Sequence, residues 1–150
     1  MEAARVEESK SAFKQVISAS INITAPAVRV WALLTDAKAM PSWNSTITSV
    51  EGDIALGQKI ATRVPVSPRT FVLTVTAFEP PRRMVWRDGG LPMFEGVREY
   101  TLTEDGAGGT RFVMTETFRG LMLPLIAGSL PDFKPIFERY AADLKRAAQA

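Results

Sequence analysis

Cysteine and histidine are both missing from the 150 residues of this chain. The absence of cysteine excludes disulfides, thiol nucleophiles and thiolate metal sites. The absence of histidine excludes a Ser-His-Asp triad, a histidine general base and histidine-ligated zinc, iron or copper. Any catalysis would therefore rest on Asp, Glu, Lys, Arg, Tyr, Ser or Thr side chains, and we expect neither a metal nor another cofactor.

Long apolar runs and clustered charges are lacking as well. The longest apolar run, residues 121–127, is interrupted by Pro124, so we expect no integral membrane association. The first residues include acidic side chains and lack the apolar core of a secretory signal, so we expect a cytoplasmic protein. The formal net charge is only +2 and the basic residues are dispersed, which argues against a nucleic-acid partner.

Length and patterning predict one domain over residues 13–150, preceded by a loose N-terminal extension over residues 1–12. Alternating, β-branched segments predict strands over residues 13–23, 46–51, 58–64, 69–78, 82–87, 94–103 and 110–119. Helices are expected over residues 26–35 and from about residue 131 to the C-terminus, with a short helical turn following the first helix.

The C-terminal segment has the spacing of an amphipathic helix with a wide apolar stripe. The stripe consists of Phe133, Ile136, Phe137, Tyr140, Ala141, Leu144 and Ala148. Consecutive strands without intervening helices pair antiparallel, because parallel pairing needs long crossovers. The pattern therefore predicts an α+β fold in which a curved antiparallel sheet of about six to seven strands wraps around the C-terminal helix and encloses an apolar pocket.

Three stretches of this chain resemble the SRPBCC superfamily, which contains START domains and birch-pollen-allergen-like proteins. They are VWALLTDAKAMPSWNSTITSVEGD (residues 30–53), FEPPRRMVWR (residues 78–87) and GGTRFVMTETFRGLMLPLI (residues 108–126). The chain looks most like the polyketide cyclase/dehydrase-like branch. The resemblance covers residues 13–149 and implies a helix-grip fold with a cavity for lipids, polyketides, phytohormones or other hydrophobic molecules. Only some members of this superfamily are enzymes.

The resemblance also has a departure that bears on chemistry. Related sequences often carry a histidine where this chain has Arg98, and another where it has Met114. Histidine-based chemistry of such relatives therefore has no counterpart here.

The last predicted hairpin places two opposite charges on a face that is otherwise apolar and aromatic. Closing the EDGAGG loop symmetrically pairs Leu102 with Phe112, Tyr100 with Met114, and Arg98 with Glu116. A lone buried charge is very costly, whereas a hydrogen-bonded pair is tolerable. The pair has two interpretations, namely a polar feature at the base of the pocket that orients a ligand, or a structural ion pair that pins the strand register.

Other residues are candidate pocket residues because of their position and chemistry. With Arg98 and Glu116, the predicted ligand-binding set comprises Trp43, Trp86, Tyr100, Phe112, Met114, Leu123, Phe133, Phe137 and Tyr140. Each aromatic member can equally be a core residue, since aromatic side chains dominate burial in general. Residues 121–130 can be a lid over the pocket, a loop buried against the sheet or a contact in a possible homodimer.

Three functions are compatible with these observations. The first is binding or carriage of a small hydrophobic ligand such as a lipid, polyketide or aromatic metabolite. The second is a polyketide cyclase/dehydrase-like enzyme in which Glu116 or Tyr100 acts as acid or base and Arg98 stabilises an oxyanion. The third is a protein-interaction domain whose pocket is vestigial.

Overall fold

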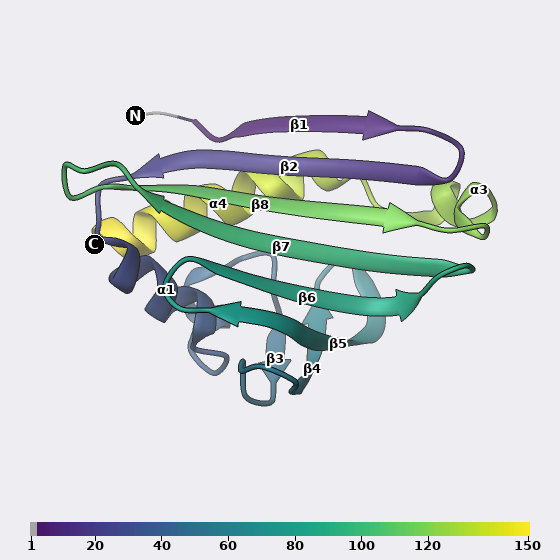
Figure 1. Cartoon of the computed structure of the whole chain (residues 1–150), viewed down its shortest axis with the longest axis horizontal. Coiled ribbons are helices and arrows are strands. Elements are labelled where there is room, and N and C mark those ends of the chain that lie inside the picture. Colours follow the sequence, from purple (N-terminus) through teal and green to yellow (C-terminus); the bar gives the residue numbers. More distant parts are fainter. Residues whose placement is uncertain (1–2) are drawn as a thin grey trace.

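The computed structural model describes residues 3–150, which form one eight-stranded antiparallel sheet with helices packed against one of its faces (Figure 1). The strands are β1 (Arg5–Lys10), β2 (Lys14–Ile23), β3 (Ser49–Glu51), β4 (Lys59–Val64), β5 (Ser67–Glu79), β6 (Arg83–Gly90), β7 (Phe94–Glu104) and β8 (Thr110–Arg119). They lie in the order β1-β2-β8-β7-β6-β5-β4-β3, so that every neighbouring pair except β2–β8 is also consecutive in the chain. The predicted fold class is confirmed.

The N-terminal part of the sheet differs from the expectation. Residues 5–10 form the edge strand β1, which pairs with β2 from Arg5 opposite Ser20 to Lys10 opposite Gln15. A loose extension was therefore the wrong prediction for these residues, and the count of six to seven strands was too low. The side chains of β1 are almost all exposed, so its sequence lacks the apolar alternation by which the other strands were recognised.

The helices are α1 (Ala27–Thr35), α2 (Met40–Trp43), α3 (Leu123–Ile126), the 3-10 turn η1 (Ala127–Ser129) and α4 (Phe133–Gln149). The predicted C-terminal helix is confirmed, and its start follows from local chemistry. The side chain of Asp132 caps the helix by accepting a hydrogen bond from the backbone N–H of Lys134 at 3.2 Å. Pro135 then lies in the first turn, where a backbone N–H has no partner within the helix. In the described part of the chain no helix is both long and apolar enough to cross a membrane.

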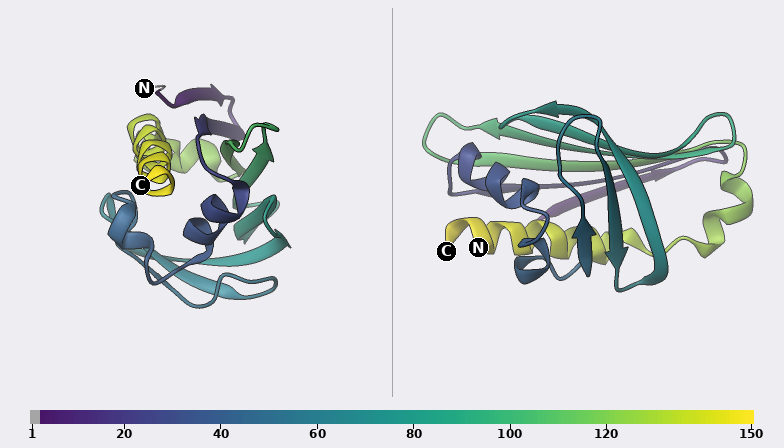
Figure 2. Two further views of the ribbon diagram at one scale, coloured as in Figure 1. Left: turned by 90° about the vertical axis from the view of Figure 1, so that its left-hand side faces the viewer. Right: turned by 90° about the horizontal axis from the view of Figure 1, so that it is seen from below.

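The sheet follows an arc around α4, from β1 on one side to β4 and β5 on the other (Figure 2). Along β2 the buried, inward-facing residues alternate mostly with half-buried ones, and Ile17, Ala19 and Ile21 are at most 2% exposed. Opposite them lies the buried stripe of α4, which includes Phe137, Tyr140, Ala141, Leu144 and Ala148. The core is thus a layer between the concave face of the sheet and one face of α4.

The C-terminal end of α4 is hydrogen-bonded to α1. Arg29 donates hydrogen bonds from Nε to the carbonyl oxygen of Ala148 at 2.6 Å and from Nη2 to that of Ala147 at 3.1 Å. The last carbonyl groups of a helix have no partner within it and carry partial negative charge, so a guanidinium there satisfies both needs. This contact ties the C-terminal end of α4 to α1.

The chain leaves β8 through Gly120, and only glycine suits this position. Its φ is 139°, and a Cβ there would overlap the backbone of Met93 in the β6–β7 connection. The neighbouring backbone holds this close approach, because the N–H groups of Leu121 and Met122 donate to the carbonyl oxygens of Pro92 and Met93 at 2.9 Å each. The approach sets where the chain enters α3.

We expect Gly120→Ala to lower the free energy of unfolding by about 2–4 kcal/mol, because the methyl group meets backbone that cannot move aside and φ is positive. Gly90→Ala is the matched control, since a Cβ at Gly90 meets no atom within 4 Å. The control is expected to change stability by less than about 0.5 kcal/mol in urea denaturation. Equal effects of the two substitutions would contradict this explanation.

Candidate functional site

A cavity of about 800 Å³ lies between the concave face of the sheet, the β4–β5 hairpin and the first two turns of α4. The β4–β5 hairpin contributes Thr62, residues 64–69, Phe71 and Leu73. The connection from α3 to α4 contributes Ile126 and residues 129–131, and α4 adds Phe133, Ile136 and Arg139. The sheet forms the remaining wall together with Thr46 and Ile47 of the loop after α2. The cavity is thus the space that stays open between the sheet and the N-terminal end of α4.

Inward-facing residues of β8, β7 and β6 form rows that run across the sheet. The mouth row consists of Phe118, Gly96 and Asp88. The middle row consists of Glu116, Arg98 and Trp86. The core row consists of Met114, Tyr100 and Met84. All members of the mouth row and the middle row line the cavity. All members of the core row are completely buried. The middle row is therefore the boundary between the cavity and the dry core.

The predicted cross-strand pair of Arg98 and Glu116 is confirmed. Arg98 donates from Nε to Oε2 of Glu116 at 2.8 Å, and the two side chains are 18% and 15% exposed. Their partial exposure is toward the cavity, whose wall they form. The sequence allowed this prediction because the hairpin loop sets the register, and the register decides which side chains meet.

The guanidinium of Arg98 lies against aromatic rings as well as against a carboxylate. Its Cζ lies 5.2 Å from the ring centre of Phe137 and 6.0 Å from that of Tyr140. Burial is the strongest single influence and lowers the pKa of Arg98, but the combined effects of Glu116, Tyr100 and Tyr140 outweigh it and leave the pKa above its ordinary value. The cavity therefore holds a permanent cation, paired on one side, at its inner end.

Several predicted pocket residues lie behind the cavity wall rather than on it. Tyr100, Phe112, Met114, Phe137 and Tyr140 are each at most 1% exposed and pack in the core between the sheet and α4. They share faces with true wall residues, but α4 packs directly on the core row and leaves no space there. The prediction that these five residues line the pocket was therefore wrong, because they lie in the core behind the wall.

The other predicted residues divide between the wall and the core. Trp86 and Phe133 line the cavity, as expected. Trp43 lies outside the wall and packs edge-on against Tyr140, with ring centres 6.0 Å apart. Leu123 is 1% exposed and anchors α3 in the protein. Of the segment over residues 121–130, only its second half reaches the cavity.

Burial also affects the two tyrosines behind the wall. It raises the pKa of Tyr100, an effect that the positive charge of Arg98 partly opposes. It raises the pKa of Tyr140 well above the ordinary value, with a further contribution from Tyr100. Both hydroxyl groups consequently keep their protons near neutral pH.

Sequence reasoning missed the wall that the β4–β5 hairpin provides. Val64, Val66, Phe71 and Leu73 line the cavity from this side, and Arg69 and Arg139 add charges. Their alternation marked them as strand residues, but only the curling of the sheet brings this distant hairpin to face α4. Within residues 3–150, no group of three acidic side chains gathers closely enough to hold a metal ion.

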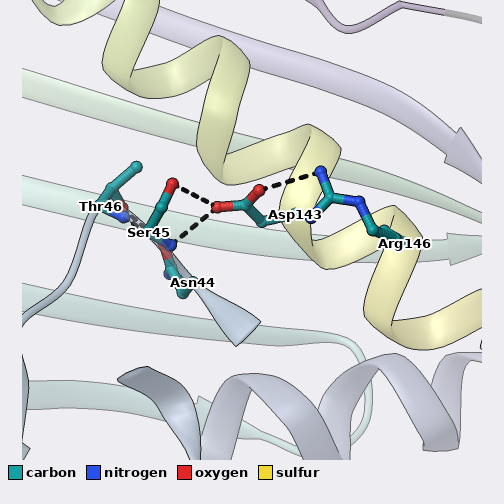
Figure 3. Close-up of polar contacts among 5 residues, drawn as sticks. All are labelled: Asn44, Ser45, Thr46, Asp143 and Arg146. Carbon is teal, nitrogen blue, oxygen red and sulfur yellow. Dashed lines mark hydrogen bonds and ion pairs between the residues drawn. The ribbon is translucent and has the colours of Figure 1, made fainter. Parts of the chain in front are cut away.

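The loop after α2 is fixed to α4 by Asp143, as Figure 3 shows. One carboxylate oxygen of Asp143 accepts hydrogen bonds from the backbone N–H of Ser45 at 2.8 Å and from its hydroxyl at 2.7 Å. The adjacent Asn44 accepts from the backbone and hydroxyl of Thr46 through its side-chain oxygen, at 3.0 and 2.7 Å. These bonds hold Thr46 at the cavity wall.

Residues 14–149 match the model of a family described as "Polyketide cyclase / dehydrase and lipid transport". No curated protein matches the chain.

Many solved structures share the fold. A START superfamily protein from Mycobacterium smegmatis is 16% identical, with 89% of this chain and 96% of that chain covered and a TM-score of 0.64. A norcoclaurine synthase point mutant from Thalictrum is 14% identical, with 93% and 97% covered and a TM-score of 0.68. CalU16 from Micromonospora echinospora is 17% identical, with 99% and 92% covered and a TM-score of 0.63. At these identities the likeness concerns the fold alone.

We expect Asp143→Ala to lower the free energy of unfolding by about 2–3 kcal/mol, because the backbone N–H and the hydroxyl of Ser45 both lose a charged acceptor. Arg146→Ala is the control, since Arg146 also binds Asp143 but its side chain is 72% exposed. We expect the control to cost less than about 1 kcal/mol in urea denaturation. A control as damaging as Asp143→Ala would show that the Ser45 contact is not what stabilises the loop.

We expect Glu116→Leu to destabilise the protein by about 2–4 kcal/mol, because it leaves the Arg98 cation mostly buried without its carboxylate. Glu116→Gln is expected to cost less, since its amide oxygen can still accept from Nε of Arg98. Glu99→Leu is the control, because the pair of Glu99 with Arg83 is 40% and 39% exposed. Its cost should stay below about 1 kcal/mol in thermal and urea unfolding. The explanation fails if Glu116→Leu is as stable as the wild type.

Proposed function

Because this chain belongs to the family described as polyketide cyclase/dehydrase and lipid transport, within the START-like SRPBCC superfamily, we propose that it binds and carries a small hydrophobic molecule. The ligand would occupy the cavity between the sheet and the N-terminal end of α4. The observation that carries this proposal is a cavity of about 800 Å³. Pockets for small organic molecules typically measure about 300–1,000 Å³.

The composition of the wall supports a hydrophobic ligand. Most lining side chains are aliphatic or aromatic, and the aromatic ones are arranged as flat surfaces. The rings of Phe94 and Phe118 stack with centres 5.9 Å apart, and those of Phe118 and Phe133 with centres 5.3 Å apart. Such faces suit an aromatic or polycyclic ligand, and the neighbouring aliphatic residues suit an alkyl chain. The proposed class therefore comprises lipids, polyketides and aromatic metabolites.

A second candidate is a cyclase or dehydratase activity on a polyketide-like substrate. The observation that favours it is that Glu116 and Arg98 face the cavity together, as an acid–base group and an oxyanion stabiliser would have to. Tyr100 supports this less, because it is completely buried in the core row. Turnover of a poly-β-keto substrate that disappears in Glu116→Gln, while ligand binding persists, would favour this candidate over simple carriage.

The third candidate, a protein-interaction domain with a vestigial pocket, has the least support. A vestigial pocket would be filled by side chains, whereas the space between the β4–β5 hairpin and α4 is open. The open volume argues for a small molecule as the partner of this surface.

The proposal predicts that filling the cavity abolishes ligand binding without unfolding the protein. Gly96 lies on the wall, where an added Cβ would meet the ring of Phe118 at 3.4 Å, so the leucine side chain of Gly96→Leu would occupy cavity space beside that ring. We expect the wild type to retain a hydrophobic molecule in native mass spectrometry after mild purification, and Gly96→Leu to lose it.

Gly90→Leu makes the same chemical change on open surface and should retain the ligand. Thermal unfolding of all three proteins checks that folding is preserved. A wild type that neither retains nor takes up any hydrophobic molecule would contradict the proposed function.

A further inference from the structure

Large apolar side chains are exposed together at one end of the sheet. Five of them, each at least 51% exposed, form the apolar tip, which consists of Phe13, Leu91, Met93, Leu121 and Leu125. They belong to the β1–β2 connection, the β6–β7 connection and the segment that leads from β8 into α3, which lie at the same end of the molecule (Figure 1). A group of exposed apolar residues of this kind marks a place where a folded protein contacts something else.

Backbone hydrogen bonds join the three connections to one another. The N–H of Gly120 donates to the carbonyl oxygen of Phe13 at 3.2 Å. The N–H of Leu121, the next residue, donates to the carbonyl oxygen of Pro92 at 2.9 Å. The side chains of the apolar tip therefore project from segments that are fixed relative to each other, and they can enter an apolar phase as a unit.

Positive charge lies beside the apolar tip, on the convex face of the sheet. Lys14 follows Phe13 in the chain, and Arg119 lies opposite Lys14 in the pairing of β2 with β8. Arg119 and Arg87 share one carboxylate, that of Glu95, at 2.9 and 2.6 Å. The side chain of Glu95 is only 4% exposed, whereas the side chains of Arg119 and Arg87 are 45% and 42% exposed. The part of this cluster that reaches solvent is therefore cationic.

The other charges near the tip do not cancel this excess. Within residues 3–150, no carboxylate lies within ion-pair distance of Lys14. Lys10, at the end of β1, is 63% exposed, and its partner Glu8 is 3.7 Å away. Asp88 belongs to the mouth row and faces the cavity instead of the convex face. The apolar tip is thus flanked by cations, and binding to a bilayer gains both from buried apolar area and from the attraction of Lys and Arg to anionic lipids.

The apolar tip is also continuous with the cavity wall. Phe94 follows Met93 in the chain and Ile126 follows Leu125, and both Phe94 and Ile126 line the cavity. The ring of Phe94 stacks on that of Phe118 in the mouth row, with centres 5.9 Å apart. A surface that contacts the tip would therefore lie next to the mouth row.

We propose that the apolar tip docks this protein on an anionic lipid surface. The five apolar side chains enter the interfacial layer, and Lys14, Arg87 and Arg119 lie against the negatively charged headgroups. The occupant is a bilayer because the tip consists of turns at the end of a sheet and offers no groove to a protein segment, and because the charge beside it has one sign. This docking goes beyond ligand carriage and does not depend on which molecule the cavity holds.

Vesicle flotation with the full chain tests the docking. One set of vesicles consists of phosphatidylcholine alone, and the other of phosphatidylcholine and phosphatidylglycerol in equal parts. We expect the wild type to bind the anionic vesicles at least about tenfold more tightly than the neutral ones. The preference should weaken as the salt concentration is raised, because salt screens exposed charges. A wild type that binds neither set, or binds both equally, overturns the proposal.

Leu125→Asp tests the apolar part of the tip. We expect it to weaken binding to the anionic vesicles at least about tenfold, because it removes apolar area and adds a charge that the headgroups repel. Leu56→Asp is the matched control, since Leu56 is also exposed but lies in the β3–β4 connection at the other edge of the sheet. It changes the net charge equally and should bind like the wild type. Thermal unfolding of both variants checks that they fold.

Lys14→Gln tests the charges beside the tip. We expect it to weaken binding to the anionic vesicles about fivefold and to leave binding to the neutral vesicles unchanged, because it removes one cation from the contact. Lys38→Gln is the matched control, since Lys38 is an exposed lysine between α1 and α2, and it should change neither.

The remaining outcomes also decide the matter. Vesicle binding that Leu56→Asp weakens as much as Leu125→Asp overturns the proposal, because net charge and not the tip would then control binding. A dimer in analytical ultracentrifugation that Leu125→Asp abolishes would assign the tip to a second copy of this chain and would overturn docking on lipid. Retention of a hydrophobic molecule is measured separately, so a failure of vesicle binding leaves the proposed function standing.

Discussion

A single helix has to cover the concave face of a sheet that is much wider than it. The 17 residues of α4 span about 25 Å and the helix is about 10 Å wide, whereas eight strands spaced about 4.8 Å apart extend over some 35 Å. The sheet meets this constraint by curling, and α1 and α2 cover part of the remaining face. Contact is complete along the C-terminal half of α4, where Arg29 and Asp143 tie it to α1 and to the loop after α2. The cavity is what stays open at the other end.

The middle row marks the place where this contact stops. On its core side lie uncharged, completely buried residues such as Met84 and Met114. On its mouth side, the mouth row lines the cavity and includes the charged residue Asp88 and the glycine Gly96. An ion pair of Arg98 and Glu116 is tolerable at this boundary, because the pair satisfies itself and retains some access to the cavity. The same boundary position leaves the guanidinium of Arg98 partly exposed to the cavity.

Much of this arrangement could be predicted from local patterns. The hairpin loop between β7 and β8 determined the pairing of Arg98 with Glu116, and the stripe of α4 identified the helix that fills the sheet. Alternation alone could not tell Arg98, on the cavity wall, from Tyr100, two residues later on the same face. That distinction depends on how far α4 extends over the sheet. The edge strand β1 was missed for a related reason, because backbone pairing with β2 holds it without an apolar face.

The sequence by itself determined the fold class, the register of the last hairpin and the exclusion of cysteine and histidine chemistry. These features follow from residue identity and from interactions between near neighbours in the chain. Tertiary structure alone decided which inward-facing residues meet open space and which meet α4, and it brought the β4–β5 hairpin across from the middle row. The physical reason is that the cavity is the gap between the concave face of the sheet and α4. The size of this gap depends on the curvature of the sheet, which is a property of all its strands together.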